Sequence, residues 1–261
     1  MKYFIGKIAK LYGLSPQTIH HYENMGLIKL NKEETSNYRY FDNINIQKLG
    51  SIKKLRNLDV PLKDTSVFLE NSNLSKQYSL YKELLIDNQE QLNNLLYKNE
   101  IINNIMHCIS VANIKDYYEI QEIEDIYYLK VNTVITDDDI ENTKYWFTNL
   151  LYTNIGHQLN RSERKPSKGF VVIAGKKAID NSKLNKIEKA NKFPSNKFVV
   201  KSFLLDKNDN EYLLFEFMDK FISEHPEYNY SDDAYVELIV VFNDEEDKKR
   251  ILVKLYLPII E

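Results

Sequence analysis

Side chains that can hydrogen-bond to nucleic acid gather between residues 15 and 39. Hydroxyl, amide and imidazole groups contact base edges or phosphates, and arginine binds phosphate. His20 and His21 could instead form a solvated helix face, and Tyr22 could equally belong to the core. The candidate DNA contacts are Ser15, Gln17, Thr18, His20, His21, Tyr22, Tyr38 and Arg39.

Two short helices joined by a tight turn are expected to position these side chains. Residues 5–12 predict the first helix, and Gly13–Ser15 the turn. Ser15 suits the N-cap and Pro16 the first position of a second helix, Pro16–Asn24, which Gly26 closes. This arrangement predicts a helix-turn-helix, whose second helix enters the major groove of DNA.

A small hairpin over Leu27–Asn37 is expected to follow the second helix. Asp42 then caps a third helix. This helix carries the basic residues Lys48, Lys53, Lys54 and Arg56.

Composition predicts a soluble protein of two domains, or of one domain plus an extension. The chain has 261 residues, 43% hydrophobic and 28% charged, with a net charge of −3. No apolar run is long enough to predict a membrane span. The start of the chain is too mixed and charged for a secretory signal. The single cysteine, Cys108, excludes an intramolecular disulfide and indicates the reducing cytoplasm.

Charge is distributed unevenly along the chain. Residues 1–70 contain 11 Lys/Arg against 7 Asp/Glu, whereas residues 116–261 contain 20 against 27. A basic head followed by an acidic body indicates that only the head meets a polyanion.

Residues 73–115 are expected to form a dimerising coiled coil. Successive seam positions in this segment are separated alternately by 4 and 3 residues, which is the heptad pattern. Asn88 and Asn99 on the seam would fix the register of a specific homodimer. The alternative is a long amphipathic helix packed on its own protein. The seam positions are Tyr81, Leu85, Asn88, Leu92, Leu95, Asn99, Ile102, Met106 and Ile109.

Beyond residue 116 the pattern predicts strands and two helices. The helices are expected over about Asp138–Asn154 and Asn210–Glu224. Strand–helix–strand–strand then occurs twice, which predicts an α+β domain with a mainly antiparallel sheet. The expected strands are Ile126–Ile135, Gly169–Ala174, Lys197–Leu205, Tyr235–Phe242 and Ile251–Ile260.

The head resembles the N-terminal winged helix-turn-helix of MerR-family transcription regulators. The resemblance covers residues 4–69 and rests on FIGKIAKLYGLSPQTIHHYENMGLIKL, NYRYFD and the helix pair IKKLRNLDVPLKD. It implies DNA binding, with Tyr38 and Arg39 on the wing contacting phosphate. Gln17 and His20 stand where the family commonly has arginines, and His21 stands at an aromatic position. Neutral histidine gives no bidentate guanine contact, so we expect an unusual operator and a flatter salt dependence.

The body is similar to the GyrI-like effector domain of multidrug-binding MerR activators. The similarity lies in the order of its elements, in YVELIVVFND and in the ending LVKLYLPI, including Tyr256. It implies a buried pocket glutamate at the position of Ile239. The nearest acid is Glu237, two residues earlier, and side chains at i and i−2 face the same side of a strand.

Such a pocket would hold a lipophilic cation between aromatic faces and one buried carboxylate. The expected ligand-binding residues are Tyr145, Trp146, Tyr152, Glu237, Ile239 and Tyr256. Each aromatic could instead be a core residue, and Glu237 could occupy a surface position. Glu216 is a second candidate carboxylate. The basic loop formed by Arg161, Arg164, Lys165 and Lys168 is expected to be solvated, with an anionic ligand as the alternative.

No metal site, cofactor or enzyme activity is expected. His107 and Cys108 alone cannot complete a zinc or copper site. Phosphate-binding, dinucleotide-binding and hydrolase motifs are absent from the sequence.

The sequence therefore predicts a winged helix-turn-helix at 1–72, a dimerisation helix at 73–115 and an effector domain of two β-α-β-β units at 116–261. The expected function is a cytoplasmic, homodimeric regulator that binds promoter DNA and a small lipophilic or cationic effector. The resemblance implies activation by DNA distortion, with RNA polymerase as an indirect partner, and no membrane is involved. Two alternatives are a repressor whose body senses nothing and a small-molecule hydrolase fused to a regulator head.

Overall fold

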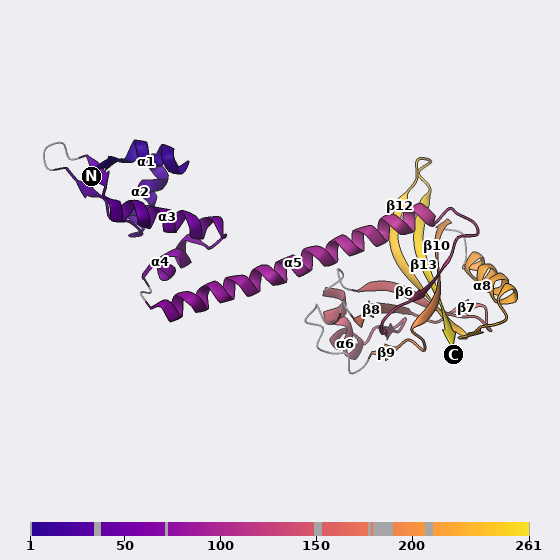
Figure 1. Cartoon of the computed structure of the whole chain (residues 1–261). Helices are drawn as coiled ribbons and strands as arrows, with labels where there is room; N and C mark the ends of the chain where they lie inside the picture. The colour runs from indigo at the N-terminus through magenta and orange to yellow at the C-terminus, as the bar shows by residue number, and fades with distance from the viewer. Residues whose placement is uncertain are drawn as a thin grey trace. The chain divides into compact units, whose positions relative to one another are not determined.

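The computed structural model describes residues 2–33, 38–70, 73–148, 153–176, 179, 190–206 and 211–260 (Figure 1). The chain divides into two compact units, Met1–Glu90 and Gln91–Glu261. Helix α5 (Leu74–Val111) contributes its first part to one unit and its second part to the other. Within the described residues, no helix has both the length and the apolar character needed to cross a membrane.

The first unit is a helical domain with a small three-stranded sheet in the order β1-β3-β2. Both helices of the predicted helix-turn-helix have the bounds expected from the sequence. The hairpin lies slightly later than predicted, over β2 and β3, and residues 34–37 of its loop lie outside the described residues. The elements are β1 (Tyr3–Phe4), α1 (Ile5–Tyr12), α2 (Pro16–Asn24), β2 (Asn31–Lys32), β3 (Arg39–Phe41), α3 (Asn43–Asn57) and α4 (Leu62–Glu70).

Local capping chemistry explains these helix ends. Ser15 Oγ accepts the Thr18 backbone N–H at 3.0 Å, so it caps α2. Asp42 caps α3 by accepting the Asn45 backbone N–H at 2.8 Å. Gly13 has φ +63°, a left-handed conformation that glycine adopts without steric cost, and it ends α1.

Helix α5 carries two parallel stripes of side chains. The predicted seam is exposed to solvent: Leu85, Leu92 and Met106 are 57%, 56% and 63% exposed. A second heptad stripe begins at Tyr97 and ends at the buried Cys108 and Val111. The second stripe packs on the sheet of the second unit, and the seam positions from Leu85 to Ile109 remain exposed in the single chain.

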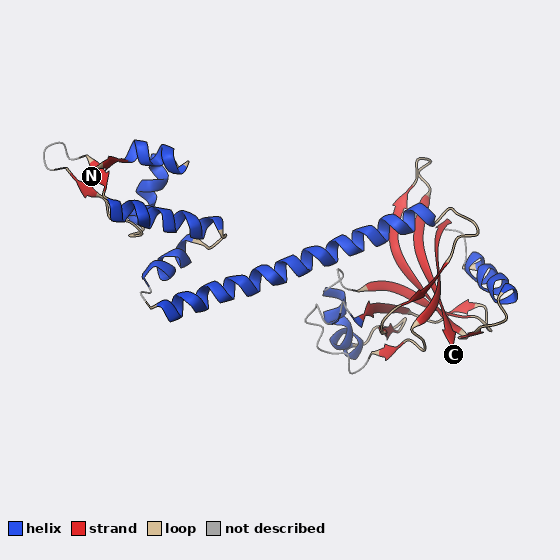
Figure 2. Ribbon diagram, in the orientation of Figure 1, coloured by secondary structure: helices blue, strands red, loops and turns tan. Residues whose placement is uncertain are grey.

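The second unit is built around one antiparallel sheet, whose strands are red in Figure 2. The strand order is β4-β10-β13-β12-β6-β8-β5-β9. Strand β11 pairs with β13, and β7 pairs with β6. From β5 onward, and apart from the two-residue strands β7, β9 and β11, the elements form two successive β-α-β-β runs, β5-α6-β6-β8 and β10-α8-β12-β13. The elements are β4 (Glu119–Glu122), β5 (Ile126–Val131), α6 (Asp137–Thr148), β6 (Asn154–Asn160), β7 (Lys165–Pro166), β8 (Phe170–Gly175), β9 (Asn191–Lys192), β10 (Lys197–Asp206), α8 (Tyr212–Glu224), β11 (Asn229–Tyr230), β12 (Asp233–Asn243) and β13 (Lys249–Ile260).

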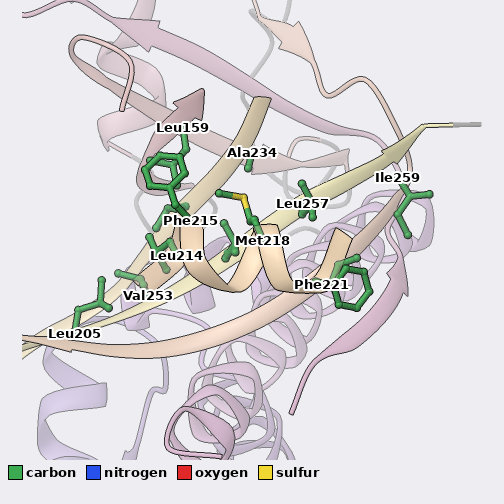
Figure 3. Close-up of a cluster of buried hydrophobic side chains, with 13 residues drawn as sticks. Leu159, Leu205, Leu214, Phe215, Met218, Phe221, Ala234, Val253, Leu257 and Ile259 are labelled. Carbon is green, nitrogen blue, oxygen red and sulfur yellow. The ribbon is translucent and has the colours of Figure 1, made fainter. Parts of the chain in front are cut away.

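Alternating side chains give this sheet two different faces. Leu255 and Leu257 of β13 lie in a buried cluster with Leu214 and Phe221 of α8, so α8 covers the outer face (Figure 3). Tyr256, which lies between them in the sequence, belongs to a second cluster on the inner face. The second stripe of α5 packs against this inner face.

Several sequence predictions for the body need correction. The first helix ends at Thr148, and Asn154 begins β6, a strand that the sequence did not predict. The polar sequence NIGHQLN lacks the alternation that identifies a half-buried strand. The first strand ends at Val131 rather than Ile135. Helix α8 begins at Tyr212, and Asn210 lies outside the described residues.

Gly156 of β6 permits close packing of two strands. A Cβ atom at this position would lie 2.0 Å from the backbone oxygen of Val236 on β12, whereas a Cβ on Gly175 meets nothing within 4 Å. We expect Gly156→Ala to lower the free energy of unfolding by about 1–3 kcal/mol, because the backbone must shift. Melting temperatures of both alanine variants test this, and an equal effect at Gly175 would contradict it.

Candidate functional site

The exposed face of α2 is formed by Gln17, His21 and Asn24. Their spacing of four and then three residues places them on one side of the helix. Gln and Asn can form paired hydrogen bonds with adenine, and the imidazole of His21 can accept or donate one. This face therefore has the chemistry needed to contact base edges. Asn24 was not among the sequence candidates, although its spacing from Gln17 and His21 indicates it.

Glu23 connects helix α2 to strand β3. Its carboxylate accepts Arg39 Nε at 3.0 Å and lies 3.4 Å from His20 Nδ1. Arg39 belongs to β3, so this ion pair fixes the strand beside α2. The structure thus brings two sequence candidates, His20 and Arg39, together around an acid that the sequence did not single out.

The remaining DNA candidates occupy distinct positions. Tyr38 is 68% exposed and, with Arg39, lines an open groove of about 680 Å³ between α2 and the wing. Ser15 and Thr18 share a hydrogen bond of 2.8 Å at the start of α2. Tyr22 is only 7% exposed and packs in the domain core, which is the alternative that the sequence left open for it.

The body contains a buried acid on the inner face of its sheet. Glu237 of β12 is 5% exposed, and Tyr256 Oη donates a hydrogen bond to its Oε2 at 2.5 Å. The two residues lie on adjacent strands, and Glu237 is paired with Lys254 across β12 and β13. Of the predicted pocket residues, Glu237 and Tyr256 are brought together.

The electrostatics of this pair follow from burial. Desolvation raises the pKa of Glu237 above its ordinary value, while the Tyr256 hydrogen bond and the nearby charge of Lys254 oppose the rise. Desolvation and the neighbouring carboxylate raise the pKa of Tyr256, so its hydroxyl remains a hydrogen-bond donor.

Glu237 and Tyr256 line a pocket of about 240 Å³ between the sheet and α5. The pocket combines aromatic and aliphatic walls with a few polar groups, the composition of small-molecule sites. Helix α5 contributes Tyr97, Glu100, Ile101 and Asn104, and the sheet side contributes Ile123, Ile126, Asn154, Ile173, Gly175, Phe193, Glu237 and Tyr256.

Aromatic rings extend from this pocket across the inner face. Phe193 stacks on Tyr235 with a centroid distance of 3.7 Å, and Tyr128 lies 5.1 Å from Tyr235. Phe198 meets Tyr256 edge to face at 6.1 Å. These rings give the pocket a rigid apolar base.

The other predicted ligand residues lie elsewhere. Trp146 is fully buried with Leu129 and Val172 on the outer face, away from Glu237. Nothing is described of the Tyr145 side chain, and Tyr152 lies outside the described residues. Ile239 sits at a β-bulge, where the register of β12 and β13 shifts between Leu238 and Val240.

The two alternative ligand sites are also separate from the pocket. Glu216 is exposed on α8 and lines a different cavity of about 710 Å³. Arg161 and Arg164 of the basic loop pair with Asp232 and Asp219, respectively, and Lys165 pairs with Glu163 at 2.7 Å.

Sequence reasoning missed the wall that α5 supplies. Tyr97, Ile101, Asn104 and Cys108 repeat at heptad spacing beside the seam, and this second stripe was the available signal. Lys254, which is 7% exposed beside Glu237, was missed because a lysine on a strand is usually solvated.

Metal ligands are not gathered in the described part of the chain. No group of three or more His, Cys, Asp or Glu side chains there could hold an ion. Cys108 is fully buried, and its thiol faces Asn104 Oδ1 at 4.0 Å.

The head is similar in sequence to known regulatory proteins. Residues 3–72 match the family described as MerR HTH family regulatory protein. The HTH-type transcriptional regulator ZntR homolog of Haemophilus influenzae is 38% identical over 73 residues, which cover 28% of this chain and 54% of that protein. The multidrug-efflux transporter 2 regulator of Bacillus subtilis is 28% identical over 95 residues, covering 36% and 35%.

One solved structure is that of HiNmlR, described as a MerR family regulator lacking the sensor domain and bound to promoter DNA. It is 22% identical, with a TM-score of 0.34, and the match covers 43% of this chain and 89% of that chain. The chain thus spans about half of the first curated relative and about a third of the second.

The first unit belongs to the winged helix-turn-helix class, because a second helix with an exposed polar face lies beside a small β-sheet. Within that class, residues 3–72 are a MerR-family helix-turn-helix domain.

The buried acid predicts a pH-dependent stability. The pKa of Glu237 in the folded protein lies above 4.5, its ordinary value, so the unfolded chain releases the proton first. At a pH below both pKa values, Glu237 is protonated in the folded and in the unfolded chain. As the pH rises through this window, the wild type should lose stability relative to Glu237→Gln, which still accepts the Tyr256 hydrogen bond.

Melting temperatures from about pH 4 to pH 8 measure this effect. The difference between Glu237→Gln and the wild type should grow with pH. The exposed Glu246→Gln variant is the control. A difference that stays constant across the range would show that Glu237 titrates as a solvated acid does.

Proposed function

We propose that the protein is a cytoplasmic, homodimeric transcription regulator that binds promoter DNA through its head and a small lipophilic or cationic effector through its body. The observation that carries this proposal is the exposed Gln17–His21–Asn24 face of α2, in a domain that matches the MerR family. The wing residues Tyr38 and Arg39 would grip the DNA backbone beside that face.

The dimer would form through the exposed seam of α5. A row of Leu, Ile and Met side chains at heptad spacing is the pattern that a second helix covers in a coiled coil, and an exposed apolar stripe of this kind marks an interaction surface. Two recognition helices would then lie about 34 Å apart and read a pseudo-palindrome.

Ligand binding would act on the promoter by distorting the DNA between its two polymerase-binding elements, with RNA polymerase as an indirect partner. DNA deformation of this kind costs several kcal/mol, so the effector must bind the two dimer states with different affinity. The pocket between α5 and the sheet supports such coupling, because one helix carries both a pocket wall and the dimer seam.

DNA binding is tested by selecting sequences from a random duplex library with the full chain. We expect a pseudo-palindrome to emerge. On the selected DNA, Gln17→Ala should relax the preference at one position per half-site by about 1–3 kcal/mol. Arg39→Met should weaken binding to all sequences alike and reduce the salt slope by about one.

The control for lost charge is Lys248→Met, an exposed lysine of the body. Equal losses of DNA affinity in Arg39→Met and Lys248→Met would show that the wing does not contact the DNA. Failure to select any DNA sequence would refute the proposed function as a whole.

The seam predicts a monomerising substitution. Leu92→Glu would place a carboxylate in the buried interface of the dimer, while position 92 remains exposed in the single chain. We expect the dimer dissociation constant to rise at least about tenfold, with the fold of each chain intact. Sedimentation velocity measures this, with the adjacent exposed Asn93→Glu as the matched control. An unchanged dimer in Leu92→Glu would place the dimer contact elsewhere.

A further inference from the structure

A second charged group is buried beside the pocket acid. Lys254 of β13 is 7% exposed and stands opposite Glu237 of β12 in the antiparallel register. Directly paired residues on one face of a sheet have Cβ atoms about 4.5–5.5 Å apart, so the two side chains share one environment. The Glu237 carboxylate therefore has the Lys254 ammonium group as its neighbour.

The Lys254 ammonium also reaches helix α5. Its Nζ donates a hydrogen bond to Asn104 Oδ1 at 3.0 Å, and it lies 5.4 Å from the centre of the Tyr256 ring. Asn104 lines the pocket from the second stripe of α5. Lys254 thus contacts the helix through Asn104 and lies beside the Tyr256 ring, on the strand position paired with Glu237.

We propose that Lys254 is an internal counter-cation that sets the charge selectivity of the pocket and transmits its occupancy to α5. This inference rests on the proposed function, because it concerns the effector pocket. In the empty pocket Lys254 supplies the positive charge that a buried carboxylate requires.

A cationic effector at Glu237 would compete with Lys254. Two positive groups within a few ångströms repel each other strongly where water is excluded. A neutral ligand of the same shape meets no such repulsion. The wild-type pocket therefore favours a neutral apolar molecule over its cationic isostere, and this selectivity resides in Lys254.

The same competition would move the helix. A cation that takes over Glu237 repels the ammonium held by Asn104, which strains the bond between the sheet and α5. Ligand charge is then converted into a changed contact on the helix that carries the dimer seam.

Matched probes test the selectivity. Phenyltrimethylammonium and tert-butylbenzene have nearly the same shape and differ by one positive charge. Calorimetric titration of the full chain should give tighter binding of the neutral probe. Lys254→Met should raise the affinity for the cation at least about tenfold and leave the affinity for tert-butylbenzene within about twofold.

Two outcomes would overturn the inference in distinguishable ways. Equal changes for both probes in Lys254→Met would mean that Lys254 only fills space, while the pocket itself stands. Absence of binding by both probes to the wild type and to Lys254→Met would count against the effector pocket of the proposed function.

Lys254→Gln separates charge from hydrogen bonding, since an amide can still donate to Asn104 while carrying no charge. Hydrogen exchange of the amides in residues 100–111 should change when phenyltrimethylammonium binds the wild type. In Lys254→Gln that change should fall by at least about half, because no charge is left to repel. An identical change in both proteins would contradict the transmission role.

A double-mutant cycle needs no ligand. Unfolding constants are measured for the wild type, Glu237→Gln, Lys254→Met and the double variant. We expect Lys254→Met to raise the unfolding constant at least about fivefold more in the chain that keeps Glu237 than in the chain that carries Glu237→Gln. Additive effects would show that Lys254 is not the counter-charge of Glu237.

Discussion

Two lysine side chains, Lys201 and Lys254, are buried where α5 and the segment after it meet the sheet of the second unit. Their charges constrain how this part of the chain packs on the sheet. A charged group without water requires partners, and each of these groups finds them across the join. Lys201 Nζ donates to the backbone oxygens of Ile114, Lys115 and Tyr117 at 3.1, 3.0 and 2.8 Å, just beyond the end of α5. Lys254 Nζ donates a hydrogen bond to the side-chain oxygen of Asn104, which lies within α5. Displacing α5 would leave Lys254 without Asn104, and displacing the segment after α5 would leave Lys201 without its three carbonyl acceptors, so both parts are held to the sheet.

This constraint gives α5 two separate roles along one segment. From residue 97 onward the helix has one stripe that the sheet covers and another that stays exposed. Ile102 and Met106 on the exposed stripe are 53% and 63% exposed, while Asn104 and Cys108 face the inner side of the sheet. A helix is stiff, so a displacement imposed on the covered stripe also displaces the exposed one. One helix therefore carries both a wall of the Glu237–Tyr256 pocket and the exposed stripe that we propose as the dimer seam.

The head was predictable because its structure is local. Ser15, Pro16 and Gly26 specify the ends of α2 through contacts within a few residues, and these are read directly from sequence. The body depends on pairing between strands far apart in the chain. Strand β6 has a polar sequence, and only its neighbours β12 and β8 make it a strand. Strand alternation made Glu237 a candidate for burial but left a surface position open, and its neighbour Lys254 depended on a register that no local pattern contains.

The position of the acid also follows from the shape of β12. Up to Glu237 the strand is paired on both sides, with Gly156 of β6 and Lys254 of β13. Beyond it the bulge at Ile239 shifts the register, and bulges re-aim the side chains that follow them. An acid at Ile239 would lie in this irregular segment, past the last contact with β6. Glu237 is the last residue held from both sides. Its neighbour on β6 is Gly156, where a Cβ atom would meet the Val236 backbone oxygen at 2.0 Å, so the close approach of β6 and β12 fixes the backbone beside the acid.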